Sequence, residues 1–167
     1  MRELAERPEF LTPASPEGLR AVQITSDTMR DSEAIYCDTP SWSPDSRFFA
    51  FYRRASDDGT QPNSLWLCDT ADDFAISPVI SYQADTVNAC LSPDGTCVYH
   101  VLKVADRLEV RRVALTGGAE TVVANAPLPL GFRGCLSMSA DGERLLVGAF
   151  LGDGKTEGAP WGAYIFE

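Results

Sequence analysis

The stretch "SWSPDSRFF" at residues 41–49 places a turn signal, Ser-Pro-Asp, directly before a hydrophobic run. The same arrangement returns as "CLSPDGTCV" at 90–98 and as "SMSADGERL" at 137–145. Aligned on their aspartates, the copies lie 49 and 47 residues apart. A near-constant period of this size is typical of a repeat architecture, so the repeat decides the fold class.

The residues of this turn explain why it returns. Pro44 and Pro93 preset φ at the second turn position, and the Ser and Asp side chains can bond the local backbone. Gly95 and Gly142 supply the left-handed φ that ends the turn. Ser46 replaces glycine in the first copy, so that turn is expected to differ slightly or to carry strain.

Each turn is followed by a run that is typical of a β-strand. These runs are "RFFAFYRR", "TCVYHVLKV" and "ERLLVGAF". Further short hydrophobic runs follow each of them, and a short segment of small residues precedes each turn. About four antiparallel strands per unit at this period predict a β-propeller blade. The alternative is a sandwich or barrel whose hairpins resemble one another by chance.

The copies "WSPDSRFFAF…SLWLCDT" and "LSPDGTCVYHV…VRRVALTGGAE" resemble the repeats of TolB-like propellers, a WD-like repeat of the Ser-Pro-Asp-Gly type. Similar repeats occur in oligogalacturonate lyase-like proteins and in the propellers of prolyl-peptidase-type hydrolases. The resemblance covers residues 19–167 and implies a fold rather than a function.

We therefore expect an all-β chain that forms a partial β-propeller. The blades are predicted at about 33–81, 84–125 and 133–167, after a mostly irregular leader at 1–18 and an orphan strand at 18–25. The third blade lacks a fourth strand, and three blades do not close a ring, since closed propellers use roughly 4–8. Either the chain is part of a longer protein, or it forms a homodimer in which the orphan strand completes the partner's third blade.

Composition excludes several partner classes. The net charge of −10 and the pI near 4.5 argue against a nucleic-acid surface, which needs clustered Lys and Arg. No apolar run approaches the roughly 20 residues of a membrane span, so no membrane partner is expected. The start, "MRELAERPEFLTP", has no apolar signal-peptide core. We expect a cytoplasmic protein.

The cysteines do not indicate a metal site or a disulfide framework. Their number, five, is odd, and no two of them form a CxxC pair. Most lie in strand-like stretches; the five are Cys37, Cys68, Cys90, Cys97 and Cys135. We expect reduced residues that act as small hydrophobic side chains in the core.

His100 is the sole histidine, and it occupies the repeat position held by Phe51 and Val147. It is either a buried structural residue or a ligand-binding one. A metal site would need His or carboxylate partners, and none is evident in the sequence, so no cofactor is expected. The lyase resemblance implies β-elimination assisted by a metal held by a His and Gln cluster. One histidine cannot build that cluster, so a divalent metal is expected only if further chain supplies it, and no catalytic residue is assigned.

Four other residues are candidates for binding. Arg53 and Arg111 each belong to an Arg-Arg pair on a predicted strand, where one member can face a shared surface and bind a carboxylate. Solvated pairing with nearby acidic residues is the alternative. Lys155 and Trp161 lie in a Gly-rich hairpin loop at 150–162, where Trp161 either stacks on a sugar or peptide or packs as a strand residue.

Two acidic or Gly-rich segments are interpreted as turns. "SDDGT" at 56–60 resembles a calcium loop in composition but lacks the later Glu, so it is predicted to be a hairpin turn. "TGGAE" at 116–120 joins two strands rather than opening a helix, so it is not a phosphate loop.

These observations predict a recognition or scaffold segment of a larger TolB-like propeller, without catalysis of its own. Its expected ligand is an oligosaccharide or a protein. The alternatives are an oligogalacturonate lyase-like enzyme whose metal-binding half is absent, and a propeller that gates a peptidase. No Gly-x-Ser-x-Gly elbow supports a hydrolase. The residues predicted to be buried in or between blades are Trp42, Phe49, Phe51, Leu65, Leu67, Val98 and Val110.

Overall fold

The fold consists almost entirely of short antiparallel strands. A computed structural model describes residues 5–26, 30–35, 39–58, 60, 62–82, 88–127, 135–150 and 161–166. Within these ranges the one helical element is η1, a single 3-10 turn at Pro8–Phe10. No helix in the described ranges is long and apolar enough to cross a membrane.

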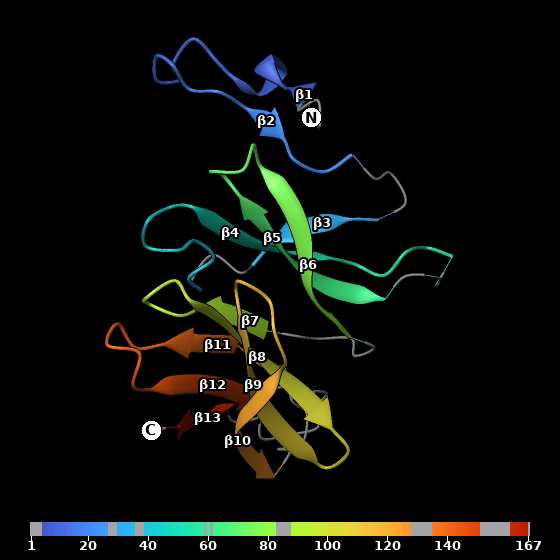
Figure 1. Cartoon of the computed structure of the whole chain (residues 1–167), viewed down its shortest axis with the longest axis vertical. Helices are drawn as coiled ribbons and strands as arrows, with labels where there is room; N and C mark the ends of the chain where they lie inside the picture. Colours follow the sequence, from blue (N-terminus) through green and yellow to red (C-terminus); the bar gives the residue numbers. More distant parts are fainter. Residues whose placement is uncertain are drawn as a thin grey trace.

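The strands form three blades and a small N-terminal sheet (Figure 1). Blade one consists of β3 (Ser32–Ala34), β4 (Phe48–Arg53), β5 (Asn63–Asp69) and β6 (Ala75–Tyr82). Blade two consists of β7 (Asn88–Leu91), β8 (Cys97–Val104), β9 (Arg107–Ala114) and β10 (Thr121–Pro127). Blade three consists of β11 (Cys135–Met138), β12 (Leu145–Phe150) and β13 (Trp161–Phe166). Each blade is an antiparallel meander, as the repeat predicts.

The N-terminal sheet lies at one end of the long axis, blade one lies next to it, and blades two and three lie side by side in the other half of the view (Figure 1). One apolar core lies between blades one and two and includes Leu65, Leu67, Leu91 and Val98. A second core lies between blades two and three and includes Val101, Val110, Leu136 and Val147. Three stacked sheets with a core at each junction are the arrangement of a partial β-propeller, and they do not fit the sandwich or barrel alternative.

The inner segments of the blades meet. β7 and β11 lie side by side. The Leu91 N–H donates to the Pro40 carbonyl oxygen at 3.1 Å, which joins blade two to the segment before the first turn. The Thr39 hydroxyl donates to the Leu136 carbonyl oxygen at 3.4 Å, which joins that segment to blade three. β7, β11 and the segment at 39–40 therefore lie toward a common centre.

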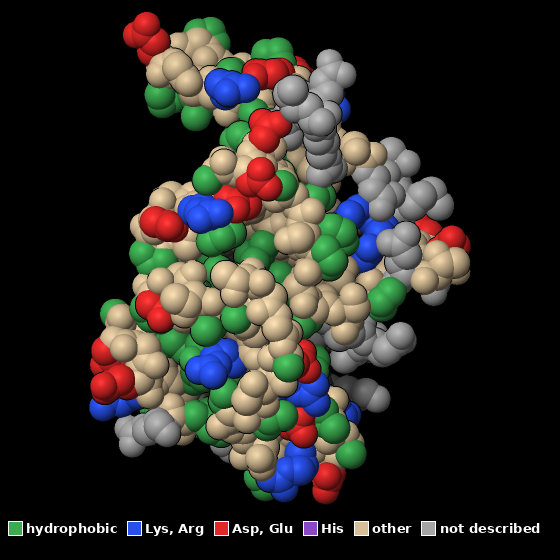
Figure 2. All heavy atoms as spheres, viewed as in Figure 1, with side chains coloured by type: hydrophobic (Ala, Val, Ile, Leu, Met, Phe, Trp, Pro, Cys, Tyr) green, Lys and Arg blue, Asp and Glu red, His purple; other side chains and the backbone are tan. Residues whose placement is uncertain are grey.

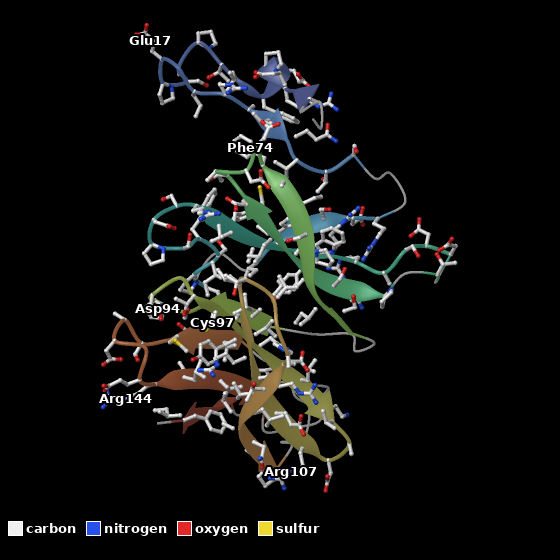
Figure 3. All side chains as sticks on the ribbon, viewed as in Figure 1. Glu17, Phe74, Asp94, Cys97, Arg107 and Arg144 are labelled. Carbon is white, nitrogen blue, oxygen red and sulfur yellow. The ribbon has the colours of Figure 1, made fainter. Side chains whose placement is uncertain are left out.

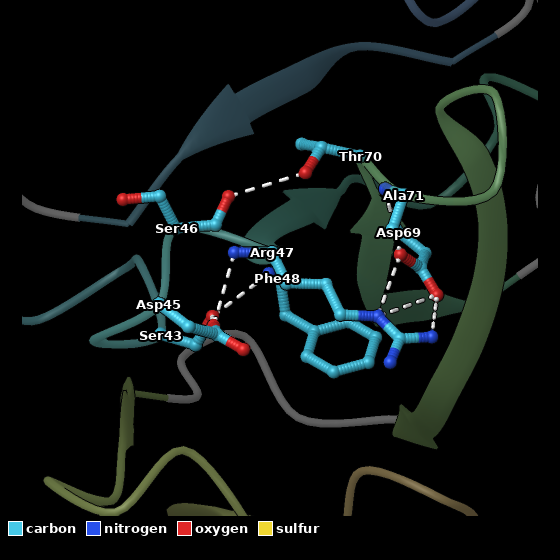
Figure 4. A network of polar contacts seen from close by, with 8 residues as sticks. All are labelled: Ser43, Asp45, Ser46, Arg47, Phe48, Asp69, Thr70 and Ala71. Atoms are coloured by element: carbon cyan, nitrogen blue, oxygen red, sulfur yellow. Dashed lines mark hydrogen bonds and ion pairs between the residues drawn. The ribbon is translucent and has the colours of Figure 1, made fainter.

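The Ser-x-Asp turns have one hydrogen-bond pattern in all three blades. In the first copy the Ser43 hydroxyl donates to Asp45 Oδ1 at 2.6 Å, Arg47 N–H donates to the same oxygen at 3.1 Å, and Phe48 N–H donates to Ser43 Oγ at 2.8 Å (Figure 4). Ser92 with Asp94, and Ser139 with Asp141, repeat these bonds. The predicted equivalence of the three turns is confirmed.

Successive turns also touch one another. A side chain at Gly95, where φ is +68°, would place its Cβ 3.1 Å from Pro44 Cδ and 3.2 Å from Ser43 Cβ of the preceding blade. At Gly142, φ is +75° and the nearest atom to such a Cβ is Pro93 Cδ at 3.8 Å. The turn glycine thus lies against the turn proline of the blade before it. Ser46, with φ of +59°, occupies the same position in blade one.

Each blade has two faces, because side chains alternate along a strand. We call the face toward the preceding blade incoming and the face toward the next blade outgoing. In blade two, Val98 is incoming and Val101 is outgoing. In blade one, Phe49 and Phe51 alternate with residues of the core shared with blade two, so they belong to the incoming face.

Burial of the predicted core residues is confirmed for five of them. Phe51, Leu65, Leu67, Val98 and Val110 are buried. Phe49 is half-buried. The prediction for Trp42 is wrong: it is 48% exposed. Its ring centre lies 4.9 Å from that of Phe49 on the incoming face of blade one, where Phe51 is buried.

The N-terminal leader contains more regular structure than the sequence predicted. The strand expected at 18–25 is reduced to β2 (Val22–Gln23), and it pairs with β1 (Ala5–Glu6). The Arg20 guanidinium also forms an ion pair with Glu6. The leading strand therefore already has a partner within its own chain.

Candidate functional site

A polar cluster around His100 is the most distinctive group of ionisable side chains in the described residues. His100 on β8 lies opposite Arg111 on β9, and Glu120 precedes β10. His100 Nε2 lies 2.9 Å from Glu120 Oε1, and the other Glu120 oxygen forms an ion pair with Arg111. Arg111 also binds Glu109, which lies two residues before it on β9, at 2.6 Å. The strand register thus brings together two of the sequence candidates, His100 and Arg111.

Burial governs the charge of this cluster. The His100 side chain is 0% exposed, whereas Arg111 and both glutamates are partly accessible. Burial lowers the pKa of His100, although the neighbouring Glu120 carboxylate opposes that change. The hydrogen bond to Glu109 raises the pKa of Arg111. The lowered pKa of His100 favours its neutral imidazole form.

The cluster does not fit a divalent metal. Glu120 uses one carboxylate oxygen on Arg111, and a guanidinium at that distance repels a second cation. His100 Nδ1 has no hydrogen-bond partner among the described residues, and the Nε2 contact is a close approach rather than an aligned hydrogen bond. In those ranges no three His, Cys, Asp or Glu side chains lie close enough to share a metal.

Arg53 lies apart from this cluster, in blade one. Its side chain is 6% exposed, and its guanidinium lies 5.0 Å from the centre of the Trp66 ring. The neighbouring Arg54 is exposed and forms an ion pair with Glu33 at 2.9 Å. Arg53 and Arg111, the two arginines predicted to bind a carboxylate, thus belong to different blades and have different partners. A role for Arg53 in binding a carboxylate stays a prediction.

The two remaining candidates lie in or beside the segment 151–160, which is outside the described residues. Lys155 falls within it. Trp161 is the first residue of β13, so its backbone belongs to a strand, and its side chain is not described. Whether Trp161 stacks on a ligand stays a prediction.

The sequence missed Trp42 as a candidate binding residue. Its exposed ring lies beside Phe49, and Phe49 lies parallel to Phe51 with ring centres 6.1 Å apart.

The acidic turns are satisfied locally rather than open to a ligand. In the segment 56–60 the Ser56 hydroxyl donates to Asp58 at 2.6 Å and Thr60 N–H donates to the same oxygen at 3.0 Å. These bonds lower the pKa of Asp58 to about 2. This is the Ser-x-Asp pattern a fourth time, and it supports the hairpin interpretation.

Asp94 lies on the same side of the molecule as Arg144, at the turn end of blades two and three (Figure 3).

Apolar side chains are visible between scattered charges over the blades on the face drawn in Figure 2. Large exposed apolar residues include Trp42 in blade one, Val122 in blade two, and Leu146 and Ile165 in blade three. Leu146 and Ile165 are cross-strand partners on the outgoing face of blade three.

The fold is shared with solved propeller proteins. An oligogalacturonate lyase in complex with manganese superposes with a TM-score of 0.64 at 19% identity, over 89% of this chain and 36% of that chain. The oligogalacturonate lyase from Vibrio parahaemolyticus superposes with a TM-score of 0.61 at 16% identity, over 82% of this chain and 34% of that chain. TolB from Acinetobacter baumannii superposes with a TM-score of 0.57 at 18% identity, over 89% of this chain and 32% of that chain. This chain has the fold of a partial β-propeller.

The likeness is structural only. No protein-family model matches the sequence, and no curated protein does. The chain spans about a third of the length of these three solved structures. At identities below one fifth they show the fold and leave the activity of this chain open.

Proposed function

We propose that this chain is a recognition or scaffold segment of a TolB-like β-propeller, with no catalysis of its own and with a protein surface as its ligand. The observation that carries the proposal is the exposure of large apolar side chains in the first and third blades. Trp42 in blade one, and Leu146 with Ile165 in blade three, are exposed to 48%, 42% and 64%. Apolar side chains grouped on exposed sheet faces are typical of interaction surfaces.

The candidate polar cluster supports the non-catalytic part of this proposal. A general base must reach a substrate proton, and His100 is 0% exposed. Arg111 is already bound by two carboxylates, so it is a poor receptor for a substrate carboxylate. The cluster is better suited to holding β8, β9 and β10 together than to turnover.

The second candidate is an oligogalacturonate lyase-like activity, favoured by the TM-score of 0.64 to the manganese-bound lyase. The test is to incubate the chain with oligogalacturonides and added Mn²⁺ or Ca²⁺ and to follow unsaturated product by ultraviolet absorbance. We expect no product above a no-protein control. Turnover that is lost in a folded His100→Ala variant would overturn the proposal and show that the chain has lyase activity.

Recognition of an oligosaccharide is distinguished from recognition of a protein by tryptophan fluorescence. We expect oligogalacturonides to leave the emission unchanged. A saturable change that disappears in Trp42→Phe would make the sugar the ligand of the blade-one aromatic residues.

A further inference from the structure

We propose that a cavity at the turn end of blade two binds a carboxylate carried on an apolar body, with Arg112 as the group that receives the carboxylate. The cavity lies where β8 begins, β9 ends and β10 begins, and its volume is about 570 Å³. That volume lies within the roughly 300–1,000 Å³ of small-molecule sites. The site goes beyond the proposed function, because none of the exposed apolar residues that carry that function lines it.

The alternation of β9 separates Arg112 from the polar cluster around His100. Arg111 lies opposite His100 and is bound by two glutamates. Arg112 lies opposite Tyr99, on the other face of the strand. Its side chain is exposed and, within the described ranges, forms no ion pair, hydrogen bond or ring contact. Since a guanidinium can bind a carboxylate bidentately, Arg112 is the member of the Arg-Arg pair that is available to an external anion.

The charge of the cavity wall is opposite to that of the chain. The chain has 24 acidic residues and a net charge of −10, yet no Asp or Glu lines the cavity among the residues that the structure describes. Arg112 is the one charged side chain in this part of the wall. Thr116 and Thr121 add exposed hydroxyl groups, which can donate to a carboxylate oxygen. A local positive site on an acidic protein favours an anion as the ligand.

The remainder of the wall suits an apolar body. Phe48 of blade one and Leu115, directly after β9, are half-buried and line the cavity. The Leu115 N–H donates to the Thr96 carbonyl oxygen at 2.9 Å, which fixes this side of the wall. Arg47 lies over the Phe48 ring at 4.8 Å, but it is paired with Asp69 at 2.8 Å and does not line the cavity (Figure 4). Apolar walls with one charged group favour an amphipathic carboxylate over an inorganic anion.

The first test uses phenylacetate, which joins a carboxylate to an aromatic ring, and phenylacetamide as its neutral counterpart. In an NMR titration of the isotope-labelled chain, we expect phenylacetate to shift the amide signals of Thr96, Leu115 and Thr121 saturably, with a Kd of about 1 mM for so small a probe. Arg112→Gln should weaken binding about tenfold or more, the loss expected for a hydrogen bond between charged groups. Arg107→Gln is the matched control, because Arg107 is also exposed on β9 but does not line the cavity. Circular dichroism verifies that both variants fold.

Cys97 supplies a second readout of occupancy. Its partly exposed thiol lines the cavity beside the turn at Asp94, whereas Cys68 and Cys90 are buried (Figure 3). A bound carboxylate should therefore slow the alkylation of Cys97 by iodoacetamide, measured on the peptide that contains it by mass spectrometry. Phenylacetate should protect this thiol in the original chain and in Arg107→Gln, and should protect it less in Arg112→Gln at the same concentration.

A peptide probe distinguishes a free acid from the end of a protein chain. The tripeptide Gly-Gly-Phe presents the same aromatic ring and carboxylate at a chain terminus. Tighter binding of the tripeptide would assign the cavity to a C-terminal carboxylate, and tighter binding of phenylacetate would assign it to a free acid; either supports the proposal if it is weakened in Arg112→Gln. The absence of saturable shifts with both probes up to about 10 mM would overturn it. So would equal binding of phenylacetamide, or binding that Arg112→Gln leaves unchanged.

Discussion

His100 Nε2 lies 2.9 Å from Glu120 Oε1, at a repeat position where the other blades have Phe51 and Val147. Blade two therefore buries an ionisable ring where its neighbours bury hydrocarbon. The cost of burying the ring is small while it is neutral, and it rises when the ring takes up a proton. The first prediction follows from this difference.

Acid should destabilise the fold through His100. Because burial lowers its folded pKa, the unfolded chain binds the proton more readily, and stability falls as the pH drops below the ordinary value near 6.5. The fall continues until the pH reaches the lowered folded pKa. Thermal unfolding between pH 7.5 and about 5, above the range of ordinary carboxylates, should show a decreasing Tm. In His100→Gln the slope should be reduced, and an unchanged slope would assign it to other groups.

The turn glycine and its serine counterpart should respond in opposite directions. Gly95→Ala adds a Cβ that is 3.1 Å from Pro44 Cδ and imposes a left-handed φ on a side chain, which costs about 1–2 kcal/mol before the contact is counted. Ser46→Gly relieves the same strain at φ +59°, partly offset by the roughly 0.5–1 kcal/mol entropic cost of glycine. Urea unfolding should therefore show a clear loss for Gly95→Ala and a small gain for Ser46→Gly. A loss in both would mean that the Ser46 side chain is needed.

The buried turn serine is expected to stabilise the fold through its two hydrogen bonds. In Ser92→Ala, Cys97 N–H loses its acceptor at 3.0 Å and Asp94 loses its donor at 2.6 Å. The loss should be about 1–2 kcal/mol, the usual range for a hydrogen bond with a partner left unsatisfied. Ser92→Thr keeps the hydroxyl and is the control. An Ala variant as stable as the original chain would show that water replaces the side chain.

Two substitutions on the incoming face of blade one separate a buried side chain from an exposed one. Phe51 is 3% exposed, and Phe51→Ala should cost about 2–5 kcal/mol, whereas Trp42→Ala at 48% exposure should cost below about 1 kcal/mol in a single copy. Denaturant unfolding at low protein concentration, where any dimer is dissociated, measures both. A mild effect of Phe51→Ala would contradict the burial of its side chain.

The sequence was sufficient for the blades and their turns because both rest on local chemistry. Pro44, Asp45 and the following hydrophobic run specify a turn and a strand without distant contacts, and that pattern recurs. The burial of Trp42 was predicted wrongly because burial depends on what lies on the other side of a sheet. The pairing of Val22 with Glu6 was missed because a two-residue ladder leaves no periodic pattern.

The cluster at His100 shows the same limit. The repeat alignment predicted that His100 lies in the core, and this is confirmed. The alignment did not predict Glu120 as its partner, since "TGGAE" is interpreted locally as a linker between two strands. Only the meeting of β8, β9 and the start of β10 places the carboxylate beside the ring.

The last prediction tests the strand exchange that the leading strand suggested in the sequence. In such an exchange, residues 20–25 of one copy would pair with the edge strand β13 of another, and deletion of residues 1–25 would abolish the dimer. In the structure Val22 and Gln23 already pair with Glu6 and Ala5 of the same chain. We therefore expect light scattering to give the same number of copies for the full chain and for a chain that starts at residue 26. A dimer of the full chain that is lost on deletion, with the far-ultraviolet spectrum retained, would contradict this and favour strand exchange.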